Sequence, residues 1–162
     1  AWRDSHLIGA AFIGPAEQEA DHPKRLGLHD DAKTILQNVA MTHDIAVEPT
    51  HRRTGTALAI KHHLNTWAHD HGAHLVLAVP MNQASRNLNE AADYTLLPPD
   101  ITLVIQIKTN RRTYAYPTNE GTTWALHLLT DTPDTPIRVG VHPPMTNPRP
   151  GHRQTTRVAF LN

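Results

Sequence analysis

Short apolar runs separated by turn residues dominate the first half of the chain. Residues 6–13 and 74–79 are continuous enough for buried strands, and a proline-containing turn follows each of them. Residues 35–47 alternate in part between apolar and polar positions, which predicts a long strand that ends before Pro49.

Two helices are predicted next to these strands. Residues 55–71 carry an apolar stripe at helical spacing, and Gly72 follows as a suitable C-terminal cap residue. The stripe consists of Ala57, Ile60, Leu64, Trp67 and Ala68. Asn82 is an effective N-cap residue, so a second helix is expected from there through Asp93.

The rest of the pattern predicts further strands and one long loop. Strands are expected at 101–108, 113–116, 123–129 and 137–141, whereas the polar residues 16–34 are expected to form a loop. The resulting order of strands and helices predicts one α/β domain with a mixed sheet flanked by helices.

The composition excludes several classes of protein. The 162 residues contain no cysteine, which rules out disulfide scaffolds and thiolate metal sites and fits a cytoplasmic protein. No apolar run approaches the roughly 18–20 residues that cross a bilayer, so no membrane association is expected. Residues 1–4 resemble neither a signal peptide nor a transit peptide and lack an initiator Met, so we expect a processed, trimmed or incomplete N-terminus.

Charge and histidine content point away from nucleic acid and metal. The 15 basic and 15 acidic residues cancel, and the arginines of the acid-free stretch 136–162 have no interleaved aromatic residue except Phe160, so nucleic-acid binding is not favoured. The 13 histidines include no HExxH pattern, and neighbours such as His62 and His63 point to different helix faces. No metal site is therefore predicted.

The stretch 45–58 has the features of an anion site. A strand is followed by two arginines, and small residues then begin a helix, whose first N–H groups have no partner within the helix. Gly55 allows a ligand to approach the backbone, Ala57 adds little bulk, and Arg52 and Arg53 supply charge suited to phosphate oxygens. By itself, the pattern also fits a solvated basic turn before a helix.

Two motifs in register give this stretch a resemblance to the GNAT superfamily, the Gcn5-related N-acetyltransferases. The first, Arg/Gln-x-x-Gly-x-Gly/Ala after a Val-rich strand end, is matched by Arg52-Arg53-Thr54-Gly55-Thr56-Ala57 after Ile45-Ala46-Val47. The second, Asn-x-x-Ala-x-x-Leu-Tyr-Glu followed by a terminal aromatic, is matched in register by Asn82, Leu88, Glu90 and Tyr94. The resemblance covers about residues 6–130.

The resemblance implies an acyl-CoA ligand, acetyl-CoA or a close relative, as co-substrate. The pyrophosphate would lie on the backbone amides of Arg53, Thr54, Gly55, Thr56, Ala57 and Leu58, near the charge of Arg52. The pantetheine arm would pair in the manner of a strand with Ile45, Ala46 and Val47. Asn82 would contact the cofactor in addition to capping its helix.

His43 and Asn89 are the residues that we expect to be catalytic. His43 lies on the face of Ile45 and Val47 if the strand is regular, and a histidine at this offset removes the amine proton in the arylalkylamine N-acetyltransferases, which the resemblance extends to this chain. Its alternative is a structural strand histidine. Asp44 and Glu48 are weaker candidates for the base.

Asn89 occupies the position of the family's Tyr, the acid for the leaving thiolate. An amide has no proton to donate there, although it can hydrogen-bond the sulfur or a water. Tyr94, Tyr114 and Tyr116 are the remaining candidates for this acid.

These expectations define two functions. The first is an acyl-CoA-dependent N-acetyltransferase that acts on an unidentified amine, and the second is a catalytically impaired GNAT-like module for CoA or protein binding.

We expect an acyl-CoA-binding part at 1–130 with a shortened N-terminal segment that lacks helices, and a basic, proline-rich extension of the same domain at 131–162. A homodimer is left open.

Overall fold

A computed structural model describes residues 1–118, 121–129, 134–143 and 158–161. Its secondary structure follows the chain in the order β1 (Trp2–Arg3), β2 (His6–Leu7), β3 (Gly9–Pro15), α1 (Glu17–Arg25), α2 (His29–Asn38), β4 (Val39–Val47), the 3₁₀ turn η1 (Pro49–His51), α3 (Thr56–Asp70), β5 (Leu75–Ala78), α4 (Gln83–Ala91), β6 (Thr95–Leu96), β7 (Thr102–Ile107), β8 (Thr113–Tyr116), β9 (Ala125–Leu128), β10 (Ile137–His142) and β11 (Ala159–Phe160).

The central sheet has the strand order β3-β4-β5-β9-β6. The pair β4–β5 is parallel, and the other neighbours are antiparallel. The predicted α/β class with a mixed sheet flanked by helices is therefore confirmed. A second, antiparallel sheet has the order β11-β10-β7-β8, so the described part of the C-terminal stretch 131–162 adds β10 and β11 to it.

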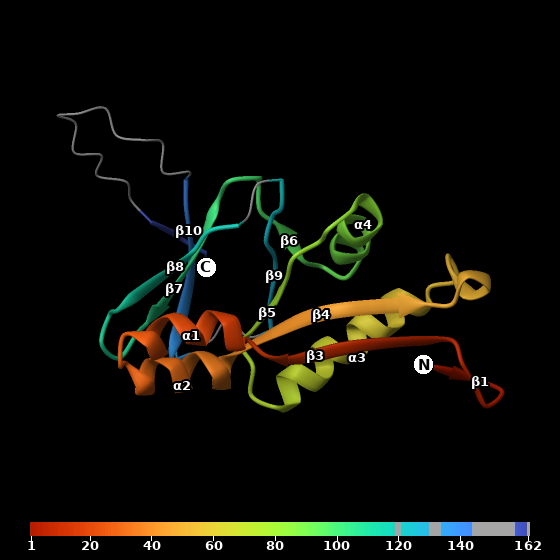
Figure 1. Ribbon diagram of the computed structural model, residues 1–162, viewed down its shortest axis with the longest axis horizontal. Helices are drawn as coiled ribbons and strands as arrows, with labels where there is room; N and C mark the ends of the chain where they lie inside the picture. The colour runs from red at the N-terminus through yellow and green to blue at the C-terminus, as the bar shows by residue number, and fades with distance from the viewer. Residues whose placement is uncertain (119–120, 130–133, 144–157, 162) are drawn as a thin grey trace.

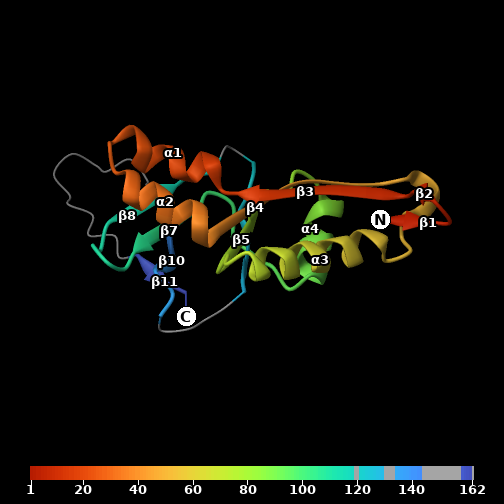
Figure 2. The same cartoon turned by 90° about the horizontal axis from the view of Figure 1, so that it is seen from below.

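Helices cover both faces of the central sheet, and the two core clusters show which helix covers which face (Figure 1). Met41 and Leu77 point into a core shared with α1 and α2, whereas their neighbours Ala40 and Val76 point into a core shared with α3 and the end of α4. This alternation follows from the two-residue period of a strand. Figure 2 shows α3 running alongside the long β3–β4 pair.

Strands β4 and β5 separate part of the way along the sheet. Residues Val39 to Thr42 pair with Leu75 to Ala78, and β5 ends there, while β4 continues to Val47 with β3 as its strand partner. A bulge accompanies the separation, because Ile13 pairs with Thr42 and Ala11 with Ile45. The β5-facing edge of the second half of β4 is left without a strand partner in the described residues.

The N-terminal segment corrects the sequence prediction. The expected loop at 16–34 contains helices α1 and α2, and the first residues of the expected strand 35–47 belong to the last turn of α2. The expected lack of helices before β4 was therefore wrong. Small or polar residues such as Glu19, Ala20 and Ala32 form much of the buried faces of these helices, which hides them from a hydropathy pattern.

The other predicted elements are confirmed to within two or three residues at each end, except that the expected strand at 6–13 is divided into β2 and β3. Within the part of the chain that the structure describes, no helix combines the length and the apolar character needed to cross a membrane.

Candidate active site

A cavity of about 530 Å³ lies where β4 and β5 separate. Its wall is formed by the second half of β4, the loop that follows it, α3, the end of β5, and α4. Eight of the residues selected from the sequence lie in this wall: His43, Ile45, Ala46, Val47, Arg52, Ala57, Asn82 and Asn89. Segments far apart in the sequence therefore meet at one site.

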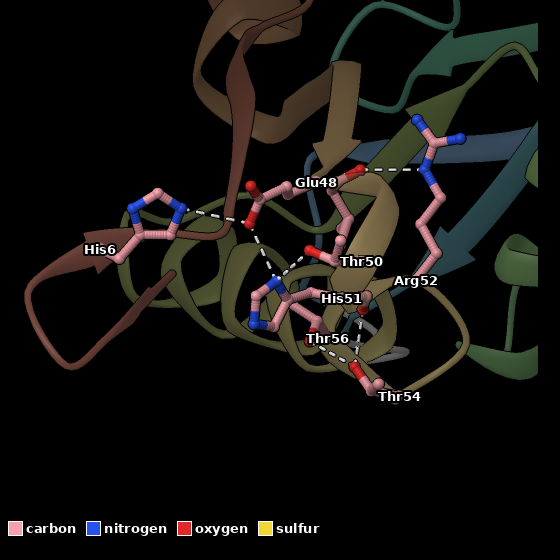
Figure 3. Close-up of polar contacts among 8 residues, drawn as sticks. His6, Glu48, Thr50, His51, Arg52, Thr54 and Thr56 are labelled. Atoms are coloured by element: carbon pink, nitrogen blue, oxygen red, sulfur yellow. Dashed lines mark hydrogen bonds and ion pairs between the residues drawn. The ribbon is translucent and has the colours of Figure 1, made fainter.

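The loop between β4 and α3 is tied down by its own side chains (Figure 3). Arg52 Nε donates a hydrogen bond of 3.0 Å to the carbonyl oxygen of Val47, which holds the arginine against the strand end. Thr54 Oγ1 donates to the carbonyl oxygen of His51 at 2.7 Å. The Glu48 carboxylate lies 3.2 Å from a ring nitrogen of His6 and 2.9 Å from one of His51. Hydrogen bonding by these imidazoles lowers the pKa of Glu48, so this residue is engaged in the loop and is a poor base.

The N-terminus of α3 has no side-chain cap. Gly55 is the N-cap residue with φ +85°, no side chain accepts from the first turn, and that turn carries no acidic residue. A Cβ atom at Gly55 would meet nothing within 4 Å, so the space above the backbone is open. The first-turn amides and the positive end of the helix dipole are therefore available to an anion.

The predicted phosphate-binding residues are not all in the cavity wall. Thr54 and Thr56 line a neighbouring cavity of about 670 Å³ beneath the N-terminal strands, and Leu58 packs against the second core cluster. Arg53 and Gly55 are exposed and lie in the wall of neither cavity. The binding of phosphate by the backbone of Arg53 to Leu58 thus stays a prediction. Within the stretch from Arg52 to Leu58, Arg52 in the loop and Ala57 in the first turn of α3 line the cavity.

Asn82 has the capping role expected from the sequence. Its side chain accepts a hydrogen bond of 2.9 Å from the Ser85 amide, and the Ser85 hydroxyl lies 3.1 Å from the Asn82 amide, which completes a capping box at the start of α4. Because Asn82 also lines the cavity, the cap fixes the end of α4 that faces it.

Asn89 is buried, and one atom of its side chain has no hydrogen-bond partner among the described residues. The residue is 5% exposed, its Nδ2 donates to the carbonyl oxygen of Ser85 at 2.7 Å, and its Oδ1 has no partner among the described residues. The amide orientation follows from the contact with Ser85, because only the nitrogen can donate to a carbonyl. Asn89 therefore brings to the cavity wall an amide with no acidic proton, and its buried Oδ1 is an acceptor without a partner among the described residues.

The three tyrosines are engaged elsewhere. The hydroxyl of Tyr94 donates to Asn65 Oδ1 at 2.6 Å, that of Tyr116 donates to the Glu19 carbonyl oxygen at 2.9 Å, and that of Tyr114 donates to the Asp31 carboxylate. None of the three lines the cavity. Burial also raises the pKa of Tyr94 above its ordinary value, so it holds its proton firmly.

His43 is an exposed residue of the cavity wall. It lies in the β4 bulge, where His43 and Asp44 together face Phe12, so the regular alternation that placed His43 on the face of Ile45 is interrupted. Its ring centroid lies 5.2 Å from that of Phe12. The structure thus brings His43 to the cavity, and its role as base stays a prediction.

Lys61 is a wall residue that sequence reasoning missed. It is 1% exposed and lies on α3 one turn after Ala57, and its Nζ lies 3.9 Å from the centroid of the Tyr94 ring. Burial lowers the pKa of Lys61 to about 7. A hydropathy pattern assigns lysine to the surface, but the spacing from Ala57 to Lys61 and on to Ala68 places it on the buried helix face.

Glu19 marks a second pocket on the opposite side of the sheet. This pocket of about 480 Å³ is lined by Glu19 and His22 of α1 and by Trp124, and it shares Val79 with the first cavity. Glu19 is 4% exposed, its Oε2 has no partner among the described residues, and burial raises its pKa. The charge of His43 lowers that pKa, which shows that the two groups are within electrostatic reach of each other.

The described residues contain no group of three His, Asp or Glu side chains arranged to hold a metal ion.

Comparisons with known proteins found similar structures but no sequence match. No protein-family model matches the chain, and no curated protein does. The fold is similar to that of Ard1 from Thermoplasma volcanium, with a TM-score of 0.48, 8% identity, and coverage of 79% of this chain and 67% of that one. It is also similar to a protein from Desulfovibrio desulfuricans described as an acetyltransferase of the GNAT family, with a TM-score of 0.43, 12% identity, and coverage of 75% and 99%. These identities leave the chemistry to be inferred from the residues of the site.

Proposed function

We propose that this chain is an acyl-CoA-dependent N-acetyltransferase that moves an acetyl group from acetyl-CoA to an amine. One observation carries the proposal: Ala57 in the uncapped first turn of α3, Arg52 in the preceding loop and the β4 edge that has no strand partner in the described residues line the same cavity. An elongated ligand with an anionic and an amide-containing part fits such a site. The phosphates would lie on the α3 amides, and the pantetheine amides would bond to the free edge of β4 at Ile45 to Val47.

The amine would enter from the second pocket. Glu19 provides a buried carboxyl group there, which suits the recognition of a cationic amine, and Trp124 provides an apolar wall. Val79 borders both pockets, so an amine and a thioester would meet at the end of β5. His43 would take the proton that the amine nitrogen loses as it attacks the carbonyl carbon.

A second function stays open because of Asn89. A CoA-binding module without turnover needs no acid for the thiolate, and Asn89 provides none. Acetyl-CoA binding combined with no transfer to a broad panel of amines would favour this alternative.

Calorimetric titration of acetyl-CoA into the wild type and Gly55→Asp tests the ligand site. The substitution places a negative charge beside the expected pyrophosphate, so binding should be lost. Gly27→Asp is the matched control, because Gly27 also has a positive φ, +74°, and would also meet nothing within 4 Å with a Cβ, but lies between α1 and α2. Equal affinities of a folded Gly55→Asp protein and of Gly27→Asp for acetyl-CoA would refute the assignment of this loop as the phosphate site.

A further inference from the structure

Lys61 is buried in the wall of the cavity without the partner that a buried ammonium group normally has. Within the described part of the chain, no carboxylate makes an ion pair with its Nζ, and the group that faces it is the ring of Tyr94. Burial of an unpaired ammonium is unfavourable by several kcal/mol, whereas a methionine of similar length would pack there without that penalty. A lysine in such a place is therefore a candidate for chemistry.

The reaction proposed above lacks a proton donor for its leaving group. When the amine displaces the thioester, the sulfur leaves as a thiolate and must gain a proton. Asn89 has none to give, and the hydroxyl groups of the three tyrosines are bonded outside the cavity. This lack of a proton donor follows from the contacts that these four side chains make.

The titratable groups in the cavity wall are few. They are His43 on β4, Arg52 in the loop and Lys61 on α3, while the lining residues of β5 and α4 carry no titratable side chain, and Tyr94 packs against Lys61 from the segment that follows α4. Arg52 does not release its proton, because a guanidinium has a pKa above about 12. His43 is assigned to accept the proton that the amine loses, so it does not donate one to sulfur. Among the titratable residues of the wall, Lys61 is the remaining one that can give up a proton.

We propose that Lys61 is the acid that protonates the departing thiolate. The inference rests on the proposed acetyl transfer. The amine nitrogen forms a bond to the carbonyl carbon, and the carbon–sulfur bond breaks with its electron pair going to sulfur. The Lys61 ammonium gives one proton to that sulfur and becomes a neutral amine. One proton leaves the acceptor nitrogen for His43, and exchange with solvent restores both groups.

The acidity of Lys61 suits this step. An ordinary thiol has a pKa of about 8.5, so a lysine with the ordinary value of about 10.4 would be too weak an acid to protonate a thiolate efficiently. Because burial lowers the pKa of Lys61 to about 7, proton transfer to the thiolate becomes favourable. Before transfer, the ammonium also stabilises the developing negative charge on sulfur.

Bound CoA gives a test that does not depend on turnover. The ultraviolet absorbance of thiolate reports how much of the bound thiol is ionised at about pH 7, where a free thiol of pKa about 8.5 is only a few per cent ionised. In the wild type and in the exposed-lysine control Lys33→Met, bound CoA should stay a thiol at about pH 7, because the Lys61 ammonium is the stronger acid of the two and gives its proton to sulfur. A thiolate fraction above the free value in both proteins that Lys61→Met abolishes, with CoA bound in all three, would show an ammonium–thiolate pair in which Lys61 keeps its proton, and would overturn the proposal.

Rate profiles separate proton donation from charge alone. Lys61→Met should lower kcat for acetyl transfer about 10²-fold, at the low end for acid–base catalysis because a thiolate is already a good leaving group. It should also remove the fall in rate above about pH 7. Lys61→Arg keeps the charge but holds its proton, so recovery of the wild-type rate by Lys61→Arg would overturn the role as acid, as would acetylation of Lys61 itself seen by mass spectrometry. Loss of CoA binding by the wild type would instead refute the proposed function.

Discussion

Replacement of Lys61 by methionine should make the protein more stable, and the gain should depend on pH. In the unfolded chain, Lys61 keeps its proton up to about pH 10.5, whereas in the folded chain burial lowers its pKa to about 7. Between these two values the unfolded state binds more protons than the folded state, so the free energy of unfolding of the wild type rises with pH. Lys61→Met has no such proton and should lack this rise.

The size of the effect follows from the two pKa values. At about 1.36 kcal/mol per pH unit, burial of Lys61 disfavours folding by about 4 kcal/mol at pH 7 and by about 2 kcal/mol at pH 9. The contact with the Tyr94 ring offsets roughly 1 kcal/mol of this where the amine is charged. We therefore expect the stability advantage of Lys61→Met to shrink by about 2 kcal/mol between these two pH values.

Urea unfolding of the wild type, Lys61→Met and Lys33→Met at several pH values from about 6 to 9 measures this difference. The range stops below the pH at which tyrosines titrate. The raised pKa of the buried Tyr94 makes the free energy of unfolding fall with pH there, which is opposite to the effect of Lys61. Lys33 is exposed on α2, so its substitution should change stability by less than about 0.5 kcal/mol at every pH. A gap between Lys61→Met and the wild type that stays constant with pH would show that Lys61 titrates as an ordinary lysine, which would refute the reasoning.

Three further substitutions test other parts of the site and fold. His43→Ala should lower kcat/KM about 10²–10⁴-fold, with unchanged acetyl-CoA affinity in calorimetry; a rate close to that of the wild type would make His43 structural. Asn89→Tyr should raise acetyl transfer or leave it unchanged, since it adds a hydroxyl group at the vacant acid position, and a large loss of rate would reveal a role for Asn89 itself. The Asp31 carboxylate is buried, which raises its pKa, but hydrogen bonds from Tyr114, Asn110 and Arg112 outweigh burial and lower it. Asp31→Asn should therefore destabilise the fold by about 2 kcal/mol at neutral pH, and the difference in thermal unfolding should vanish as the pH falls below about 4; a difference that persists in acid would contradict this.

The sequence was sufficient for the central part of the fold and insufficient for its first helices. The elements from β4 to α4 follow from apolar runs bounded by strong signals, such as Gly72 after α3 and the Asn82 cap of α4. By contrast, α1 and α2 bury faces rich in alanine and polar groups, and α1 contains Pro23 in its interior, which propensity disfavours. Their helical state depends on packing against β4, β5 and the second sheet, which a local pattern does not contain.

The candidate site was predictable in its outline because its residues lie at fixed spacings within and between β4, the loop before α3, and α4. His43, Arg52, Asn82 and Asn89 were chosen by spacing, and the structure places all four around one cavity. The cavity itself arises where β4 and β5 separate, and the pairing of these strands joins residues far apart in the sequence, such as Val39 and Leu75, which no local signal encodes. Lys61 was missed for a different reason, since its burial depends on a face of α3 that also carries the polar Asn65.

The buried polar atoms without a partner belong to residues that line two of the three pockets described above. The buried side-chain atoms without a hydrogen-bond partner in the described residues are Glu19 Oε2, Thr42 Oγ1 and Asn89 Oδ1. Glu19 lines the pocket beside α1, and Thr42 and Asn89 line the cavity that contains Lys61. A buried polar group without a partner destabilises a fold by about 1–3 kcal/mol, so these three residues are places where the pocket walls are less stable than the apolar cores. Because Val79 borders both pockets, ligands bound in the two pockets would meet beside the same residue.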